Sequence, residues 1–86
     1  ALDNALDEAA AKHKGIVSPA AGNADILLMP DIEAGNIFYK SLVYLSKAAT
    51  GALIMGAAAP VIMTSRSDSA EAKLNSIAAA MLVSGV

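Results

Sequence analysis

Several residue types that carry common chemistries are missing or scarce in this 86-residue chain. It has no cysteine, which excludes disulfide bonds and cysteine-ligated metal, and it has a single histidine. The chain has six basic and eight acidic residues, and it has no basic cluster beyond residues 12–14. This composition argues against nucleic-acid binding. The longest apolar run, residues 52–63, contains Gly56 and Pro60 and falls short of the roughly 20 residues that span a membrane. We therefore expect neither nucleic acid nor membrane as a partner.

Sequence motifs of several enzyme classes are absent as well. No G-x-G-x-x-G or Walker A pattern supports a dehydrogenase-like or P-loop enzyme. The single histidine and the lack of a G-x-S-x-G elbow disfavour a serine hydrolase, and His13 has no partners at metal-ligand spacing. We expect no metal site and a cytoplasmic location. Because Ala1 is not a methionine, we expect it to mark a boundary within a longer protein.

What the chain has in excess is apolar surface. Hydrophobic residues make up 56% and charged residues only 16%, against the usual quarter. A chain this short buries only a modest core, so much of this surface needs a cover. We expect the cover to be a second copy in a homo-oligomer or the remainder of a longer enzyme.

The order of apolar runs and turn residues predicts alternating helices and strands. The expected segments are a helix over 3–14 stopped by a left-handed Gly15, a loop over 16–23, a strand over 24–29, a turn over 31–35, a helix over 36–49 ended by Gly51, strands over 52–55 and 60–63, and a helix reaching about residue 82. Ser67 or Ser69 can cap the last helix, with Glu71 near its N-terminus. This alternation predicts an α/β fold with a mainly parallel sheet and flanking helices in three layers.

One candidate site follows the last predicted strand. Arg66 offers a planar fork of donors for phosphate or carboxylate, and Ser65 adds a hydroxyl beside it. The plainer alternatives are a surface or ion-paired arginine and a serine that only shapes a turn. Asp68 could pair with Arg66 or cap the helix.

A second polar cluster, at residues 31–36, follows the first predicted strand. Asp31, Glu33 and Asn36 could contribute to a site. The alternative is a capped turn in which Asp31 or Glu33 accepts helix N–H groups, Gly35 allows a tight backbone and Asn36 bonds locally. Tyr39 and Tyr44 are expected to be packing residues.

The ordered series of motifs resembles the C-terminal portion of the phosphate acetyl- and butyryltransferases. The segments that carry the resemblance are LDNA (2–5), EAAAKHKGI (8–16), AGNAD (21–25), PDIEAGN (30–36), YK (39–40), GAAAPV (56–61) and SR (65–66). They cover essentially the whole chain, and their order is more specific than any one of them. Residues 65–71 with Lys73 and Leu74 resemble the butyryltransferase branch more than the acetyltransferase branch.

This resemblance implies an enzyme that exchanges an acyl group between coenzyme A and inorganic phosphate. The substrates would be acyl-CoA and inorganic phosphate. Coenzyme A itself would be a substrate of the reverse reaction, and no resident cofactor is implied. Family members have two α/β domains that face each other across a cleft, and they usually form dimers. Residues 1–51 would belong to the second domain, and residues 52–86 would return to the first.

The resemblance also assigns roles to residues. Ser65 would hydrogen-bond the thiol or the reacting carbonyl, and Arg66 would hold phosphate or stabilise the oxyanion. Glu33, Gly35 and Asn36 would bind substrate from the facing domain. The family's acetyltransferase branch has a proposed aspartate base where this chain has Ala72, so Asp68 is the candidate substitute.

The sequence therefore supports two hypotheses about function. The first is a phosphate butyryltransferase-like enzyme, of which these residues alone would be an inactive C-terminal part. The second is a small α/β module that binds an anion or a protein and catalyses nothing. The reading frame upstream of Ala1 separates them, because a cognate domain there favours the enzyme and a start codon favours the module.

Overall fold

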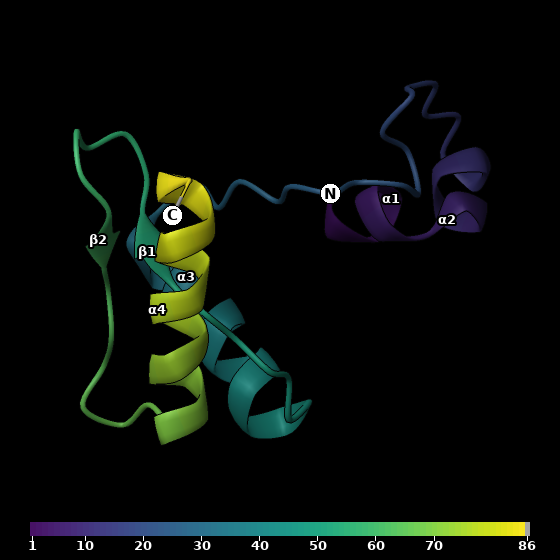
Figure 1. Cartoon of the computed structure of the whole chain (residues 1–86). Coiled ribbons are helices and arrows are strands. Elements are labelled where there is room, and N and C mark those ends of the chain that lie inside the picture. Colours follow the sequence, from purple (N-terminus) through teal and green to yellow (C-terminus); the bar gives the residue numbers. More distant parts are fainter. Residues whose placement is uncertain (86) are drawn as a thin grey trace. The chain divides into compact units, whose positions relative to one another are not determined.

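The computed structural model describes residues 1–85, which form helices and one small sheet (Figure 1). The elements are α1 (Leu2–Leu6), α2 (Glu8–His13), α3 (Ile32–Lys40), the π-helical turn η1 (Ser41–Leu45), β1 (Leu53–Ile54), β2 (Val61–Ile62) and α4 (Ala70–Ser84). The chain divides into two compact units, Ala1–Gly35 and the part from Asn36 onward. This division reflects which residues of the chain pack against one another. The domain boundary at residue 51, which concerns a longer enzyme, stays a prediction.

In the first unit, the single helix predicted over residues 3–14 is broken in two at Asp7. The Asp7 backbone is extended, with φ −126° and ψ 114°, and its side chain accepts a hydrogen bond from the N–H of Ala9 at 3.1 Å. An aspartate side chain competes in this way with the helical hydrogen bonds of the backbone. The apolar periodicity runs through Asp7 without a break, so it predicted one continuous helix, and that prediction is wrong.

Two glycines shape the loop that follows α2. Gly15 has φ +70°, which confirms the predicted left-handed stop. Gly22 also has a positive φ, +74°, and its N–H donates to the carbonyl of Asn4 at 2.8 Å. The loop is thereby attached to α1.

The strand predicted over residues 24–29 is not formed. This segment has no regular secondary structure, and the side chains of Ile26 and Leu28 are 87% and 92% exposed. A strand exists only where a neighbouring strand takes up its N–H and C=O groups, and no strand of residues 1–85 pairs with this segment. The apolar pattern predicted a buried strand without supplying the neighbour that a strand needs.

In the second unit, the two later strands are found where they were predicted, although each is shorter. They pair antiparallel, with Leu53 opposite Ile62 and Ile54 opposite Val61. The expected parallel, three-layer sheet is not formed within residues 1–85. Residues 55–60 join the two strands, and a parallel crossover needs a dozen residues or more. The short connection therefore dictates the antiparallel pairing.

Helix α3 begins and ends earlier than the sequence pattern predicted. The Asp31 carboxylate accepts the N–H of Ala34 at 2.8 Å, which caps the helix before Ile32, and this was one of the two alternatives for residues 31–36. The helix continues as the π-helical turn η1, and Lys47 then takes a left-handed conformation with φ 55°. The helical run therefore ends before Gly51.

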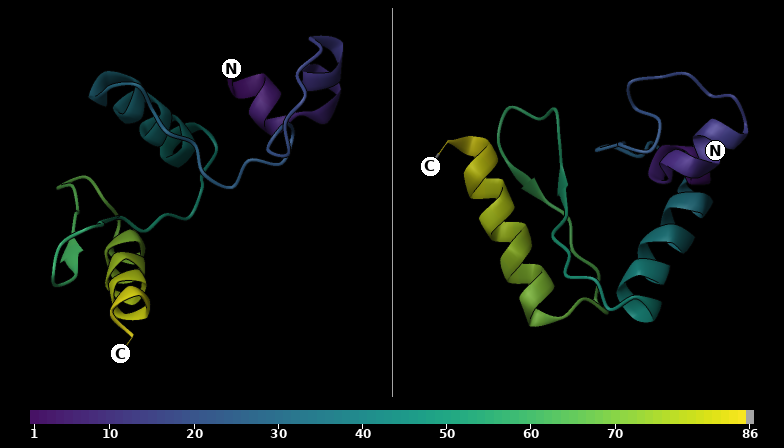
Figure 2. Two further views of the ribbon diagram at one scale, coloured as in Figure 1. Left: turned by 90° about the horizontal axis from the view of Figure 1, so that it is seen from above. Right: turned by 90° about the vertical axis from the view of Figure 1, so that its right-hand side faces the viewer.

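Helix α4 packs against both strands, as two further views also show (Figure 2). Ser69 caps it, since its hydroxyl accepts the N–H of Ala72 at 3.0 Å, and Glu71 lies in the first turn as predicted. Ser76 is only 2% exposed and joins α4 to the segment before β1 by accepting the N–H of Ala52 at 2.9 Å.

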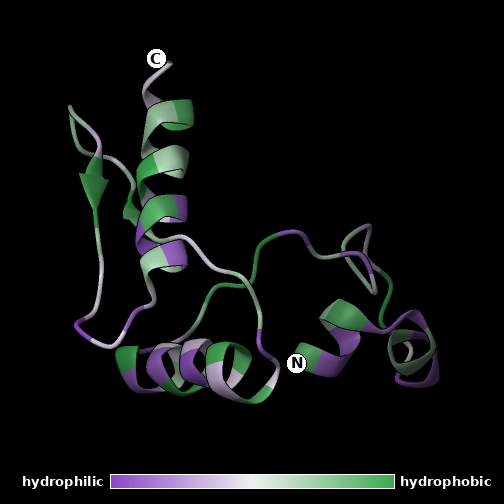
Figure 3. Ribbon diagram, turned by 60° about the horizontal axis from the view of Figure 1, so that its bottom comes forward, coloured by the Kyte–Doolittle hydropathy of each residue, from purple (hydrophilic) through white to green (hydrophobic). Residues whose placement is uncertain are grey.

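Much apolar surface in the second unit stays exposed. Both strands are hydrophobic (Figure 3), yet Val61 and Ile62 are exposed, and so are Leu74 and Leu82 on α4. Among residues 1–85, no helix combines the length and the hydrophobicity needed to cross a bilayer.

Candidate functional site

The predicted site residues Ser65, Arg66 and Asp68 lie together in one tight turn before α4. The N–H of Asp68 donates to the carbonyl of Ser65 at 3.0 Å, and the N–H of Ser65 donates to Oδ2 of Asp68 at 2.7 Å. Two hydrogen bonds thus close a four-residue turn over residues 65–68, which we call the serine–arginine turn. Arg66 and Ser67 occupy its two central positions.

The turn presents Arg66 to solvent. Arg66 is exposed, and the ion pairs within residues 1–85 join Lys12 to Glu8 and Lys14 to Asp3, so none of them uses it. The predicted alternative of an Arg66–Asp68 pair is therefore not found. A guanidinium without a carboxylate partner keeps its fork of donors available for an external anion.

The hydroxyl of Ser65 is exposed as well and has a local partner. Its Oγ lies 3.1 Å from Oγ of Ser67 and accepts the N–H of Ser67 at 3.4 Å. Serine commonly supports turns in this way. One lone pair and the hydroxyl proton can still reorganise toward a ligand, because the residue is exposed.

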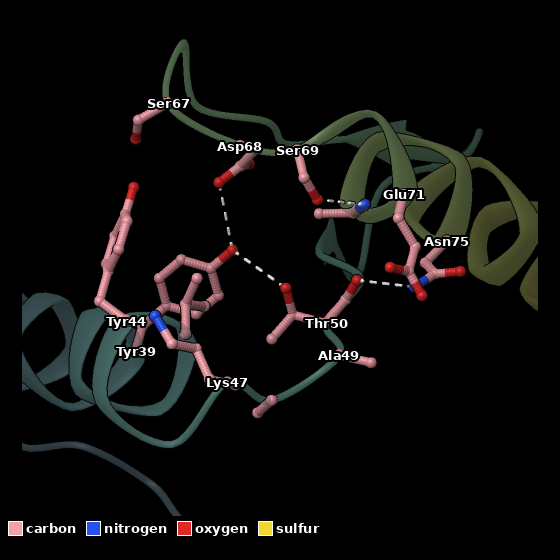
Figure 4. A pocket seen from close by; sticks show the side chains of 13 residues that line it. Tyr39, Tyr44, Lys47, Ala49, Thr50, Ser67, Asp68, Ser69, Glu71 and Asn75 are labelled. Atoms are coloured by element: carbon pink, nitrogen blue, oxygen red, sulfur yellow. Dashed lines mark hydrogen bonds between the residues drawn. The ribbon is translucent and has the colours of Figure 1, made fainter.

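Asp68 ties the turn to helix α3 (Figure 4). Its second oxygen, Oδ1, accepts the hydroxyl of Tyr39 at 3.3 Å, and that hydroxyl also lies 3.3 Å from Oγ1 of Thr50. The Thr50 carbonyl in turn accepts the side-chain amide of Asn75 at 3.2 Å. Asp68 therefore does not cap α4, which was its other predicted alternative; Ser69 does.

A hollow of about 260 Å³ lies beside this hydrogen-bonded cluster, within the second unit. Its lining combines aromatic, small and charged side chains: Tyr39, Val43, Tyr44, Lys47, Ala48, Ala49, Thr50, Ser67, Asp68, Ser69, Glu71, Ala72 and Asn75. The part of the chain that the structure describes holds no group of three or more side chains suited to a metal ion. Nothing in the lining therefore points to metal chemistry.

The contact between Tyr39 and Asp68 was not predicted from the sequence. Tyr39 was expected to be a packing residue, but it is half-buried and its hydroxyl contacts Asp68, which lies 29 positions further along the chain. A buried tyrosine hydroxyl generally needs a partner, and that general rule was the one available signal. The rule does not name the partner.

The other predicted site residues lie on or next to helix α3. Glu33 is exposed in the first turn of this helix, and Gly35 approaches Met29, with a Cβ at that position meeting the Met29 Cβ at 3.8 Å. Asn36 lies in the second unit and lines a separate shallow hollow with Lys40 and Tyr44. Among residues 1–85, no hydrogen bond joins Asn36 to the serine–arginine turn. The position of Glu33, Gly35 and Asn36 opposite the serine–arginine turn stays a prediction from the resemblance.

Ala72 lies in the first turn of α4 and lines the hollow. Its backbone N–H bonds Ser69, and its methyl group offers no proton acceptor. The carboxylate of the serine–arginine turn belongs to Asp68, and each of its oxygens already accepts one hydrogen bond.

The sequence profile of a family described as "Phosphate acetyl/butaryl transferase" matches residues 1–81. The chain belongs to this family. The family predicted from the ordered motifs is therefore confirmed.

Individual relatives in both branches of the family are similar to the chain. It is 60% identical over 83 residues to a phosphate butyryltransferase of Clostridium beijerinckii and 61% identical over 84 residues to a probable phosphate butyryltransferase of Bacillus subtilis. These matches cover 96% and 98% of the chain but only 28% of each relative. A phosphate acetyltransferase of Thermotoga maritima is 60% identical over 78 residues, which cover 91% of the chain and 26% of that protein.

The chain thus spans little more than a quarter of the length of these relatives. Identity reaches 60% both toward a butyryltransferase and toward an acetyltransferase, so overall similarity does not separate the two acyl groups. The preference for the butyryltransferase branch stays a prediction from residues 65–74.

Proposed function

We propose that the protein containing this chain, called the parent enzyme below, exchanges an acyl group between coenzyme A and inorganic phosphate. Butyryl is the proposed acyl group, with acetyl as the alternative within the same reaction. The observation that carries the proposal is the family match over residues 1–81. An exposed Arg66 without an ion-pair partner in residues 1–85 is what a phosphate site in such an enzyme requires.

The proposed chemistry is an acyl transfer through a tetrahedral intermediate. A phosphate oxygen attacks the thioester carbonyl, the carbon–sulfur bond breaks, and coenzyme A leaves as a thiolate that then gains a proton. Arg66 holds the phosphate and stabilises the charge that develops on the carbonyl oxygen. The Ser65 hydroxyl donates a hydrogen bond to the sulfur or to that oxygen. In the reverse direction the thiol, with a pKa near 8.5, needs a base or a positive field to attack at neutral pH.

The proposed aspartate base of the acetyltransferase branch corresponds to Ala72 in this chain, and Asp68 is the candidate base that takes over its role. Each of its oxygens accepts one hydrogen bond, from Tyr39 or from the backbone N–H of Ser65, and keeps a second lone pair that could accept the thiol proton. Glu33, Gly35 and Asn36 are proposed to bind substrate from the facing domain.

The remaining expectations about the parent enzyme are part of the same proposal. Its two α/β domains would hold residues 1–51 and 52–86 on opposite sides of a cleft, and a mainly parallel sheet in three layers would include strands from outside this chain. The enzyme would act in the cytoplasm without a resident cofactor. It would also form a homo-oligomer, a state favoured by the exposed apolar residues Ile62, Leu74 and Leu82.

The test is an acyl-CoA phosphorolysis assay on the parent enzyme. Butyryl-CoA and acetyl-CoA are each supplied with inorganic phosphate, and acyl phosphate and free thiol are measured. We expect both products with at least one substrate, a higher kcat/KM for butyryl-CoA, and no turnover by the 86-residue chain alone. Phosphate binding without acyl phosphate formation would instead favour the non-catalytic module.

Oligomerisation has its own test. Light scattering coupled to size-exclusion chromatography measures the mass of the parent enzyme and of the 86-residue chain. We expect more than one copy in both cases, because exposed apolar area favours association. A monodisperse monomer of the parent enzyme would contradict the proposed homo-oligomer.

A further inference from the structure

A hydrogen-bonded relay connects helix α3 to the serine–arginine turn. The hydroxyl of Tyr39 donates to Oδ1 of Asp68 at 3.3 Å, and Oδ2 of the same carboxylate accepts the N–H of Ser65 at 2.7 Å. One carboxylate thus bridges a side chain of α3 and the backbone of the turn that presents Arg66 (Figure 4). The Tyr39–Asp68 bond is part-buried and spans 29 positions of sequence.

The relay fixes the orientation of the Asp68 carboxylate. With only the bond from the Ser65 N–H, the carboxylate could rotate about its terminal torsion, because that torsion is broad. The second bond from Tyr39 restricts this rotation, so that Oδ2 stays directed at Ser65. The Tyr39–Asp68 bond is part-buried, which reduces competition from water and strengthens this bond.

We propose that Tyr39 is a positioning residue for acyl transfer: its hydroxyl holds Asp68 so that Asp68 keeps Ser65 and Arg66 in the geometry that receives phosphate. The inference rests on the proposed function. Thr50 supports the arrangement, since its Oγ1 lies 3.3 Å from the Tyr39 hydroxyl and limits where that hydroxyl can turn.

Tyr44 provides the matched control. It lines the same hollow and also comes from the α3–η1 helical run, but it is exposed and has no hydrogen bond to Asp68 among the described residues. Removing its hydroxyl takes one polar group from the lining of the hollow without touching the relay. Comparing Tyr44→Phe with Tyr39→Phe therefore separates the effect of losing any tyrosine hydroxyl in the hollow from the effect of losing the hydroxyl that contacts Asp68.

The experiment is a double-mutant cycle in the parent enzyme with Tyr39→Phe and Asp68→Ala. Loss of one hydrogen bond from the relay should lower kcat/KM roughly 3- to 10-fold in Tyr39→Phe. We expect KM for phosphate to rise while KM for acyl-CoA stays near the wild-type value, because the turn carries the phosphate-binding Arg66. In the Asp68→Ala background, Tyr39→Phe should cause no further loss, and Tyr44→Phe should match wild type throughout.

The alternative outcomes overturn the inference. Wild-type kinetics in Tyr39→Phe, or an equal loss in the presence and absence of Asp68, would show that the hydroxyl does not act through Asp68. A Tyr39→Phe enzyme that loses its fold, as judged by circular dichroism, would show a purely structural role. If the wild-type parent enzyme forms no acyl phosphate, the proposed function fails instead, and the two failures are therefore distinguishable.

Discussion

Asp68 and Ser65 hold each other by two reciprocal hydrogen bonds: the Ser65 N–H donates to Oδ2 of Asp68 at 2.7 Å, and the Asp68 N–H donates to the Ser65 carbonyl at 3.0 Å. The backbone N–H groups of Ser65, Ser67 and Asp68 therefore all find acceptors inside the turn. Arg66, at its centre, has no ion-pair partner among residues 1–85 to give up before it binds an anion.

Arg66→Ala tests whether this guanidinium serves the proposed reaction. In the parent enzyme we expect kcat/KM for phosphorolysis to fall by about 100-fold or more, the order of loss seen when one donor to a developing oxyanion is removed. Arg66→Lys should recover part of the loss, since it restores charge without the planar fork. Lys73→Ala removes an exposed cation from α4 and serves as the control, with activity near wild type. Normal activity in Arg66→Ala would reject the assigned role.

Ser76→Ala tests the link between α4 and the segment before β1. The Ser76 hydroxyl accepts the N–H of Ala52 at 2.9 Å and donates to the carbonyl of Ala72 at 2.8 Å. Its removal leaves the Ala52 N–H without a partner, so we expect a loss of about 1–3 kcal/mol in the free energy of unfolding. Denaturant unfolding of the parent enzyme measures it. Ser84→Ala, at an exposed position, should cost far less.

Gly22→Ala and Gly15→Ala form a matched pair in the first unit. Both glycines have positive φ, +74° and +70°, so alanine is strained at either position by about 1 kcal/mol. A Cβ at Gly22 would also come within 2.7 Å of the Glu8 backbone, whereas nothing lies within 4 Å at Gly15. We expect Gly22→Ala to lower the unfolding midpoint of the parent enzyme clearly more than Gly15→Ala. Equal shifts would mean that the loop does not pack on α2 as described.

The Asp3–Lys14 ion pair predicts a local pH dependence. The hydrogen bond from Lys14 Nζ, at 2.6 Å, lowers the pKa of Asp3 below its ordinary value of 3.8, helped by the backbone N–H of Asn4. Because the folded pKa is the lower one, the stabilisation is present above the ordinary value and is lost as pH falls through the folded pKa. An NMR titration of the Asp3 carboxyl should show the lowered midpoint in wild type.

The control for that titration is Lys14→Gln, which removes the cation and should move the midpoint back toward the ordinary value. Lys12→Gln removes the neighbouring cation that pairs with Glu8 instead, and it should leave the Asp3 midpoint nearly unchanged. A midpoint that does not respond to Lys14→Gln would refute the ion pair.

Local hydrogen-bonding chemistry could be predicted from the sequence. Asp31 and Ser69 were named among the possible helix caps, and Gly15 as a left-handed stop, because each effect depends on residues within three or four positions. The break at Asp7 was missed because an aspartate can either sit on a helix surface or cap a new helix. The apolar pattern around it is the same in both cases.

By itself the sequence determined the family, since seven ordered motifs specify membership without any coordinates. It also predicted the stop at Gly15 and named Asp31 and Ser69 among the possible helix caps. Only the tertiary structure decided that residues 24–29 pair with no strand of residues 1–85 and that Tyr39 meets Asp68. Caps and turns are set by neighbours along the chain. Strand pairing and side-chain relays depend on which distant groups come to lie within hydrogen-bonding distance, and a linear pattern does not contain that information.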